Sequence, residues 1–155
     1  MKQKKQYTNR SDYWNTPTEM YNHIINNLKY IDYNPENSYI DPFNYNARFH
    51  HKDKIFINPP FSILSKPEFI ETIQELIMCE NEILLLIPAR TDTKYFHKLL
   101  DYKPKIYMIK GRLKFNDKGS APFPSLLLKF NNYDKCKYIP LDRDKIKELE
   151  EWKIS

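Results

Sequence analysis

The chain has 155 residues, 41% of them hydrophobic and 29% charged, which predicts one domain with a real core and leaves little room for a second. Its formal net charge is +5, with 25 Lys and Arg residues against 20 Asp and Glu residues. Gly111 and Gly119 are its only glycines, so a Gly-rich phosphate loop is excluded, and with it an ordinary nucleotide triphosphatase or NAD-dependent dehydrogenase.

Basic residues are concentrated at the start of the chain. Lys2, Lys4, Lys5 and Arg10 lie in a stretch that contains no acid. We predict that residues 1–12 form a basic flexible tail and that residues 13–155 form a single domain. Such a tail is attracted to a polyanion such as nucleic acid, although an unstructured solubilising tail is an equally common explanation.

Cysteine and histidine patterns exclude several other classes of protein. Cys79 and Cys136 lack C-x-x-C spacing, which argues against a disulfide framework or a zinc knuckle and suits a reducing cytoplasm. His50 and His51 are adjacent with no second ligand pair nearby, so we expect no metal site. No apolar run approaches the roughly 18 residues that a membrane span needs. We therefore expect a cytoplasmic protein with no membrane partner.

The first predicted element is a helix over residues 17–31. Thr16 is expected to cap it, with Pro17 at the first helical position and Glu19 as the capping-box partner. Apolar residues then recur at helical spacing and predict a buried stripe along one face. The members of this stripe are Met20, Ile24, Ile25, Leu28 and Ile31.

The rest of the chain alternates between predicted strands and predicted helices. Residues 83–87 are all Ile or Leu, as expected for a strand that is buried on both faces of a parallel sheet. Further strands are predicted at residues 38–41, 54–57, 106–109 and 126–130. Further helices are predicted at residues 69–79, at residues 95–100, and at the end of the chain, where Ile146, Leu149 and Trp152 face together. The alternation predicts an α/β layered fold with a mostly parallel sheet.

The segment after the strand at residues 54–57 is the main candidate for chemistry, because it reads Asn58-Pro59-Pro60-Phe61. Ligands in open α/β sheets gather at the carboxyl ends of strands. The prolines have no N–H to donate, which leaves carbonyl oxygens free to point into a cleft. A strand that is stopped by an ordinary turn is the alternative, because Asn-Pro is a common turn dipeptide. From this segment alone, the turn is the favoured interpretation.

Several motifs in a fixed order extend the evidence to most of the chain. They are residues 12–17 (DYWNTP), 41–43 (DPF) with Asn46 and Ala47, 58–62 (NPPFS), 86–93 (LIPARTDT), 111–115 (GRLKF) and 121–125 (APFPS). In this order the chain resembles the phage-type Dam DNA N6-adenine methyltransferases from Tyr13 to Phe130. The resemblance implies a minimal Rossmann-like class I methyltransferase with a mostly parallel, shortened sheet. It also implies transfer of a methyl group from S-adenosylmethionine to adenine N6 in DNA.

The resemblance assigns catalysis to Asn58, Pro59, Pro60 and Phe61. Methylation of an exocyclic amine requires the nitrogen lone pair to face the sulfonium methyl group, so both amine hydrogens have to be held. The side-chain oxygen of Asn58 and the carbonyl of Pro59 are the expected acceptors. Phe61 is expected to stack on a base that has been flipped out of its duplex. Without the family context, a core position explains Phe61 equally well.

The resemblance also implies a site for the methyl donor. Asp41 is expected to receive the methionine ammonium group and Phe43 to pack on the adenosine. The structural alternatives are that Thr16 only caps a helix and that Asp41-Pro42 is an ordinary turn. The chain departs from the wider class because it lacks a Gly-rich turn and an evident second strand with a ribose-binding acid. Asp53 is the nearest substitute, but a solvated loop acid is the better expectation. The donor-binding residues are Trp14, Asn15, Thr16, Asp41, Pro42 and Phe43.

Arg90, Arg112 and Lys114 are candidates for contacts to DNA phosphates, because they lie at expected strand ends or in loops. Ordinary surface charge explains them equally well, and Arg90 could instead pair with Asp92. Phe123, between two prolines, is expected to be an exposed aromatic that enters DNA or pins two strands together. The rival functions are methylation of another amino nitrogen, in an RNA base or a protein glutamine, and a catalytically inactive nucleic-acid-binding descendant.

Overall fold

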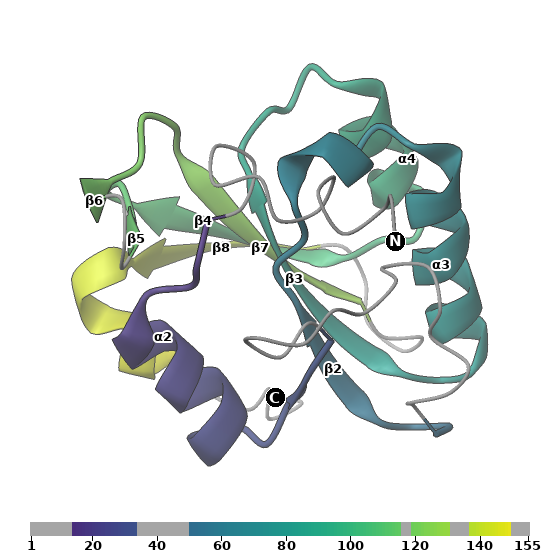
Figure 1. Cartoon of the computed structure of the whole chain (residues 1–155), viewed down its shortest axis with the longest axis horizontal. Helices are drawn as coiled ribbons and strands as arrows, with labels where there is room; N and C mark the ends of the chain where they lie inside the picture. The colour runs from purple at the N-terminus through teal and green to yellow at the C-terminus, as the bar shows by residue number, and fades with distance from the viewer. Residues whose placement is uncertain (1–13, 34–49, 116–118, 131–136, 150–155) are drawn as a thin grey trace, which may run out of the picture.

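The computed structural model describes residues 14–33, 50–115, 119–130 and 137–149, which form a layered α/β fold (Figure 1). At its centre is a six-stranded sheet in the order β1-β2-β3-β7-β4-β8. Neighbouring strands are parallel except where β7 pairs antiparallel with β3 and β4. The strands are β1 (Ile31–Asp32), β2 (Lys54–Ile57), β3 (Glu82–Pro88), β4 (Lys105–Lys110), β7 (Ser125–Phe130) and β8 (Lys137–Asp142), with a separate pair β5 (Lys114–Phe115) and β6 (Gly119–Ser120). The predicted α/β fold with a mostly parallel sheet is confirmed.

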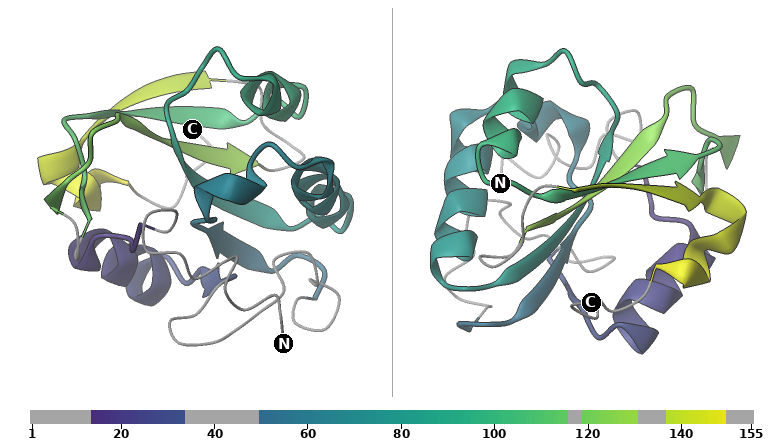
Figure 2. Two further views of the ribbon diagram at one scale, coloured as in Figure 1. Left: turned by 45° about the horizontal axis from the view of Figure 1, so that its top comes forward. Right: turned by 180° about the vertical axis from the view of Figure 1, so that it is seen from behind.

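Helices cover both faces of this sheet (Figure 2). The helical segments are α2 (Thr18–Asn22), the π-helical η1 (His23–Asn27), the 3-10 helix η2 (Phe61–Ile63), α3 (Pro67–Met78), α4 (Lys94–Leu100) and the 3-10 helix η3 (Arg143–Glu148). One face is covered by α2, η1 and η3, and the other by α3 and α4. Within the described ranges, no helix has the length and apolar character needed to cross a membrane.

Side chains of β3 alternate between two hydrophobic cores. Leu84 and Leu86 lie in the core beneath α2 and η3, whereas Ile83, Leu85 and Ile87 lie in the core beneath α3 and α4. Successive residues of a strand point to opposite faces, so a strand that is covered on both faces is apolar at every position. This two-sided burial explains the continuous run of Ile and Leu that predicted the strand.

The N-terminal helix begins later and ends earlier than its apolar spacing predicts. Its N-cap is Pro17, one residue later than expected, and no side chain makes a hydrogen bond to the cap. The helix loosens into the π-helical turn η1 and ends at Leu28, because Lys29 takes a left-handed conformation (φ 65°). Ile31, expected in the buried stripe, instead lies in the edge strand β1 and is 43% exposed.

The C-terminal part of the sheet contains a strand that the sequence pattern does not predict. Pro140 argues against a strand at β8, but β8 lies at an edge of the sheet, where proline is tolerated. Ile146 and Leu149 are buried as expected, in and just after the 3-10 helix η3. The other predicted elements correspond to β2, β4, β7, α3 and α4. Trp152, the strand predicted at residues 38–41 and the predicted tail at residues 1–12 lie outside the described residues.

A polar network occupies the end of the sheet at which β2 and β3 begin. Glu82 accepts a hydrogen bond from the Tyr30 hydroxyl (2.7 Å) and forms an ion pair with Lys129 Nζ (3.2 Å), although the Lys129 side chain is only 3% exposed. Lys54 Nζ donates to the Leu28 carbonyl (2.6 Å) and lies 4.6 Å from the centroid of the Tyr30 ring. The charges of Glu82, Lys129 and Lys54 are therefore all partnered within the protein.

Candidate active site

Asn58 follows β2 at the opposite end of the sheet and is held by the first segment that the structure describes. The side chain is 4% exposed, and its Nδ2 donates to the Trp14 carbonyl (2.6 Å) and to Thr16 Oγ1 (2.9 Å). A carbonyl oxygen can only accept, so the contact with Trp14 determines which end of the amide is nitrogen. Oδ1 is therefore turned away from Trp14, and it has no hydrogen-bond partner among the residues that the structure describes.

The two prolines after Asn58 are buried, and their carbonyl oxygens differ in environment. Pro60 O accepts from Ile63 N (3.2 Å) in the turn that opens η2. Within the described part of the chain, Pro59 O accepts no hydrogen bond. Two acceptors that have no partner among the described residues, Asn58 Oδ1 and Pro59 O, thus stand next to each other along the chain.

Three aromatic rings pack together beside this loop. The Phe123 ring contacts the Trp14 ring edge to face (5.3 Å between centroids, 86°) and the Phe61 ring likewise (5.2 Å, 74°). Phe123 is 9% exposed, so the expectation of an exposed aromatic is wrong. Its loop is pinned to the end of β3 by a hydrogen bond from Ala89 N to Pro124 O (2.8 Å), which turns the ring inward. Phe61 is half-buried and borders both hydrophobic cores.

The predicted donor-binding residues fall into two groups. Trp14, Asn15 and Thr16 are all largely or partly buried beside Asn58. Asp41, Pro42 and Phe43 lie outside the described residues. The alternative role of Thr16 as a helix cap is wrong, because the N-cap is Pro17 and the Thr16 hydroxyl accepts from Asn58.

Asp53 does not lie where a ribose-binding acid is needed. Its carboxylate accepts from His50 N (2.8 Å) in the turn that precedes β2. This turn is at the amino end of the strand, whereas Asn58 is at the carboxyl end. The expectation that Asp53 is a loop acid is confirmed. In the described ranges, no group of three or more His, Cys, Asp or Glu side chains is arranged to hold a metal ion.

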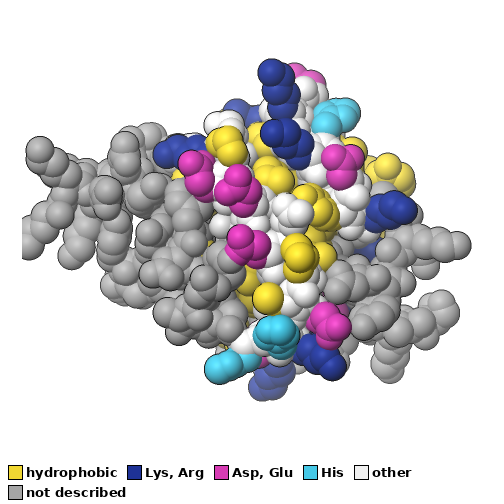
Figure 3. Space-filling view, turned by 90° about the vertical axis from the view of Figure 1, so that its right-hand side faces the viewer, with side chains coloured by type: hydrophobic (Ala, Val, Ile, Leu, Met, Phe, Trp, Pro, Cys, Tyr) yellow, Lys and Arg dark blue, Asp and Glu magenta, His cyan; other side chains and the backbone are white. Residues whose placement is uncertain are grey.

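A cleft of about 450 Å³ opens beside Phe61, and we call it the basic cleft. Among the described residues that line it, several are apolar, four are cations and none is an acid. Figure 3 shows the face that carries α3 and α4, with Lys and Arg side chains at its upper end, where α4 lies in Figure 1, and others at its lower end. The lining residues are Phe61, Leu64, Ser65, Lys66, Pro67, Ile70, Pro88, Arg90, Thr93, Lys94, Tyr95 and Lys98.

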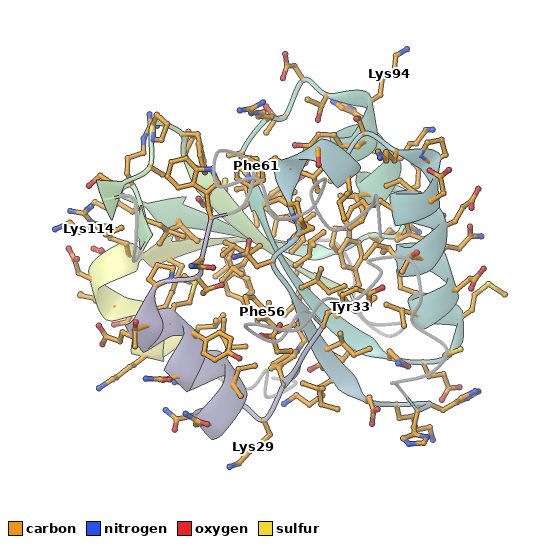
Figure 4. All side chains as sticks on the ribbon, viewed as in Figure 1. Lys29, Tyr33, Phe56, Phe61, Lys94 and Lys114 are labelled. Carbon is orange, nitrogen blue, oxygen red and sulfur yellow. The ribbon has the colours of Figure 1, made fainter. Side chains whose placement is uncertain are left out.

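Arg90 lies on the rim of the basic cleft, but the other two predicted phosphate contacts do not. Arg90 is exposed and forms no ion pair with Asp92 or with any other residue in the described ranges. Arg112 and Lys114 are exposed near β5, on the other side of the molecule. Figure 4 shows Lys114 at the left edge and Lys94 at the top, with Phe61 between them. The three predicted residues therefore do not form one cluster.

Gly111 begins the segment that carries Arg112. It has a positive φ of 86°, and a Cβ atom there would come within 2.6 Å of Arg143 Cδ. The Arg143 side chain crosses this glycine and donates from Nη1 to the Arg112 carbonyl (2.7 Å). The positive φ is what favours glycine at position 111, and a larger residue there would also displace the Arg143 side chain.

Lys66, Lys94 and Lys98 are cleft residues that sequence reasoning missed. They belong to two segments separated by β3, and lysines are abundant throughout the chain. One signal was available: Lys98 lies in the helix predicted at residues 95–100, and Lys94, four residues earlier, directly precedes it, so a helix that starts one residue sooner places both on one face.

The mostly parallel sheet, with an Asn-Pro-Pro-Phe loop at the carboxyl end of β2, is compatible with a small Rossmann-like methyltransferase fold. The family model of the DNA N-6-adenine-methyltransferases (Dam) matches residues 3–143 of the chain. The chain therefore belongs to the Dam family, as its resemblance predicted. No curated protein matches the sequence.

Proposed function

We propose that this protein transfers a methyl group from S-adenosylmethionine to N6 of adenine in DNA. Membership of the Dam family supports the class of reaction. The orientation of the Asn58 amide is the observation that carries the proposal. With Nδ2 bonded to Trp14 and Thr16, Asn58 keeps its oxygen as an acceptor for an outside donor.

The chemistry of an exocyclic amine explains why two acceptors are needed. The lone pair of adenine N6 is delocalised into the ring, and transfer requires it to become localised and to face the incoming methyl group. Asn58 Oδ1 and Pro59 O would each accept one amine hydrogen and favour the pyramidal, partly positive nitrogen of the transition state. An amide oxygen is a neutral acceptor, so the surplus proton leaves to water after transfer.

Phe61 supplies a surface for the target base. Its ring follows the two prolines directly and is held from one side by Phe123. An extruded adenine would stack on Phe61, with about 1–3 kcal/mol of stabilisation for such a contact. The same contact places the amine of the base near Asn58, three residues earlier in the loop.

The segment 14–16 suits a donor that has both apolar and polar parts. It combines the half-buried indole of Trp14 with the amide of Asn15 and the hydroxyl of Thr16, all next to Asn58. These three residues, with Asp41, Pro42 and Phe43, would hold S-adenosylmethionine. The donor, when bound, supplies a methyl group on a positively charged sulfur. Asn58 then serves both partners, through Nδ2 toward the donor-binding segment and through Oδ1 toward the base.

The test uses purified protein, donor labelled in its methyl group, and unmethylated DNA, RNA and protein substrates, with the products analysed by mass spectrometry. We expect N6-methyladenine in DNA. Asn58→Ala should lower the rate by about 10²–10³-fold, as for other lost polar contacts to a transition state, while donor affinity falls by much less, through the lost Nδ2 contacts to Trp14 and Thr16. Asn58→Asp keeps an acceptor oxygen for the base but turns a second oxygen toward the Trp14 carbonyl, so it should be impaired as well, with a larger loss of stability than Asn58→Ala.

The matched control is Asn81→Ala. Asn81 is also a buried asparagine, but it precedes β3 at the other end of the sheet and donates to the His50 carbonyl (3.1 Å). Its loss should leave the rate within twofold below the unfolding temperature. Methylation of RNA or of protein glutamine instead of DNA would overturn the proposed substrate. Absence of measurable donor binding would favour an inactive nucleic-acid-binding protein.

A further inference from the structure

We propose that the basic cleft binds the sugar-phosphate backbone of the DNA strand that carries the target adenine, beside the flipped nucleotide. Lys66, Lys94 and Lys98 join Arg90 as the phosphate-binding residues. The inference rests on the proposed function, because Phe61, which would stack on that adenine, also lines the basic cleft.

The cleft combines the two kinds of surface that a nucleotide chain requires. Its apolar lining includes the buried Leu64 and Pro88, the half-buried Ile70 and the exposed Pro67, which offer apolar contact to sugars and bases. Its cations come from both walls, with Lys66 at the start of α3 and the others on the β3–α4 connection and on α4. Proteins bind single-stranded segments of nucleic acid in positively charged grooves that carry aromatic side chains, and Phe61 and Tyr95 are the aromatic residues that line this cleft.

The cations on the α4 side are placed at an electrostatic cost to the protein itself. Lys94 is the first residue of α4, where the helix dipole is unfavourable to positive charge, and no acid occupies that first turn. Lys98 follows four residues later on the same face, where like charges repel. Neither they nor Arg90 form an ion pair with any residue that the structure describes. An external polyanion would relieve this repulsion.

The segment that presents Arg90 has a defined shape. Arg90 N donates to Pro88 O (2.9 Å), and Arg90 O accepts from both Thr93 N (3.2 Å) and Thr93 Oγ1 (2.7 Å). Thr93 also caps α4 by accepting from Phe96 N (3.4 Å). These bonds fix the position of Arg90 relative to Lys94, so the cationic rim is preorganised for binding.

Exposure of the cations favours a nucleic-acid backbone over an enclosed mononucleotide. Arg90, Lys94 and Lys98 are all exposed, so their charges face outward along the rim. Phosphates that follow a surface are contacted in this way, and such contacts position a duplex without reading its sequence. The affinity should therefore depend steeply on salt, because each neutralised phosphate releases counterions.

The test compares a Lys94→Ala, Lys98→Ala double variant with a charge-matched control, Lys145→Ala with Lys147→Ala. The control lysines are exposed on η3, on the other face of the sheet. Binding of a fluorescent duplex of about 24 base pairs is measured by anisotropy across a salt series. We expect the double variant to bind about tenfold more weakly or worse, and the slope of log K against log salt to fall by about two. The control should stay within twofold of the wild type.

Rates of methyl transfer show whether these lysines act on DNA binding or on the chemical step. We expect the double variant to raise KM for DNA by about tenfold, with kcat at saturating DNA and donor affinity unchanged. Equal DNA affinity and equal salt slope in the double variant and the control would overturn the inference, even if the protein methylates DNA. Conversely, if the protein binds DNA through these lysines but does not methylate it, the inference about the basic cleft holds and the proposed function is wrong.

Discussion

At the amino end of β3, Glu82 is bonded to Lys129 and to Tyr30. At the carboxyl end of the same strand, Arg90 is exposed and forms no ion pair within the described residues, and Lys94 and Lys98 are in the same situation nearby. Both ends carry several charged side chains. At the amino end Glu82 and Lys129 pair with each other, whereas the cations at the carboxyl end form no ion pair with any described residue. From this difference we expect the amino end to contribute to stability and the carboxyl end, as proposed above, to bind DNA.

The largest expected effect comes from breaking the network at the amino end. Glu82→Leu removes the carboxylate that pairs with the nearly buried Lys129, which should lower the free energy of unfolding by about 3 kcal/mol. Urea unfolding measures this change. Replacing both partners, with Glu82→Leu and Lys129→Met together, should recover most of the loss. If Glu82→Leu alone is neutral, the amino end does not have the stabilising role assigned to it here.

The next effect concerns the bond that orients Asn58. Thr16→Val removes one acceptor of Asn58 Nδ2, which should cost about 1–2 kcal/mol of stability and lower kcat about tenfold, because the amide is less firmly held. Thr16→Ser keeps the hydroxyl and should restore both quantities. Steady-state kinetics at saturating donor and DNA, with thermal unfolding, separate the two effects. If Thr16→Ser is as impaired as Thr16→Val although it retains the hydroxyl, the hydrogen bond to Asn58 is not what sets the two quantities.

The buried hydroxyl of Tyr95, near the carboxyl end of β3, lowers the stability of the fold. The hydroxyl is buried in the cleft wall without a hydrogen-bond partner among the described residues. Tyr95→Phe should therefore raise the free energy of unfolding by about 1 kcal/mol and leave DNA affinity unchanged. A destabilised variant would mean that the hydroxyl is satisfied in solution.

Alkaline pH sharpens the test at Tyr95. Burial raises the pKa of Tyr95 above its ordinary value of 10.0, and the Thr93 side chain and Arg90 oppose this only in part. Above pH 10.0 the unfolded chain loses a phenolic proton that the folded protein retains, so the wild type should lose stability as the pH rises. Urea unfolding at pH 8 and at about pH 10.5 should show a smaller loss in Tyr95→Phe.

The smallest effect reverses one charge on the rim of the basic cleft. Lys94→Glu places an acid in the first turn of α4, four residues before Lys98, and should stabilise the protein by about 0.5 kcal/mol. The same change should weaken DNA binding more than Lys94→Ala does. Thermal unfolding and anisotropy measure the two responses. If Lys94→Glu lowers both the stability and the DNA affinity, the assignment of stability to one end of the sheet and of binding to the other is contradicted.

The position of the Asn-Pro-Pro-Phe loop could be predicted because a short apolar strand precedes it and strand ends are where such loops lie. The same reasoning failed for Thr16, since the helix starts one residue later and leaves the hydroxyl to Asn58. Local periodicity describes which face of a helix is apolar, but a contact over 42 positions in sequence has no local signal.

The end of the first helix and the burial of Phe123 could not be predicted from local sequence either. Lys29 ends the first helix in a left-handed conformation that glycine usually adopts, so no typical residue marks the end of this helix in the sequence. Phe123 is flanked by prolines, which are typical of an exposed loop, yet its ring is drawn between Trp14 and Phe61. In both cases tertiary packing outweighs the local preference.

His23 joins the two ends of the described chain, because its Nε2 donates to the Leu149 carbonyl (2.5 Å), 126 positions later. During synthesis the layer formed by α2 and η3 therefore cannot close until almost the whole polypeptide has left the ribosome. The core beneath α3 and α4 reaches from Tyr33 to Phe130 of β7, so its last residue is made before η3 and it can assemble earlier. A truncated product would thus retain the lysine-rich wall while lacking a completed cover over the opposite face.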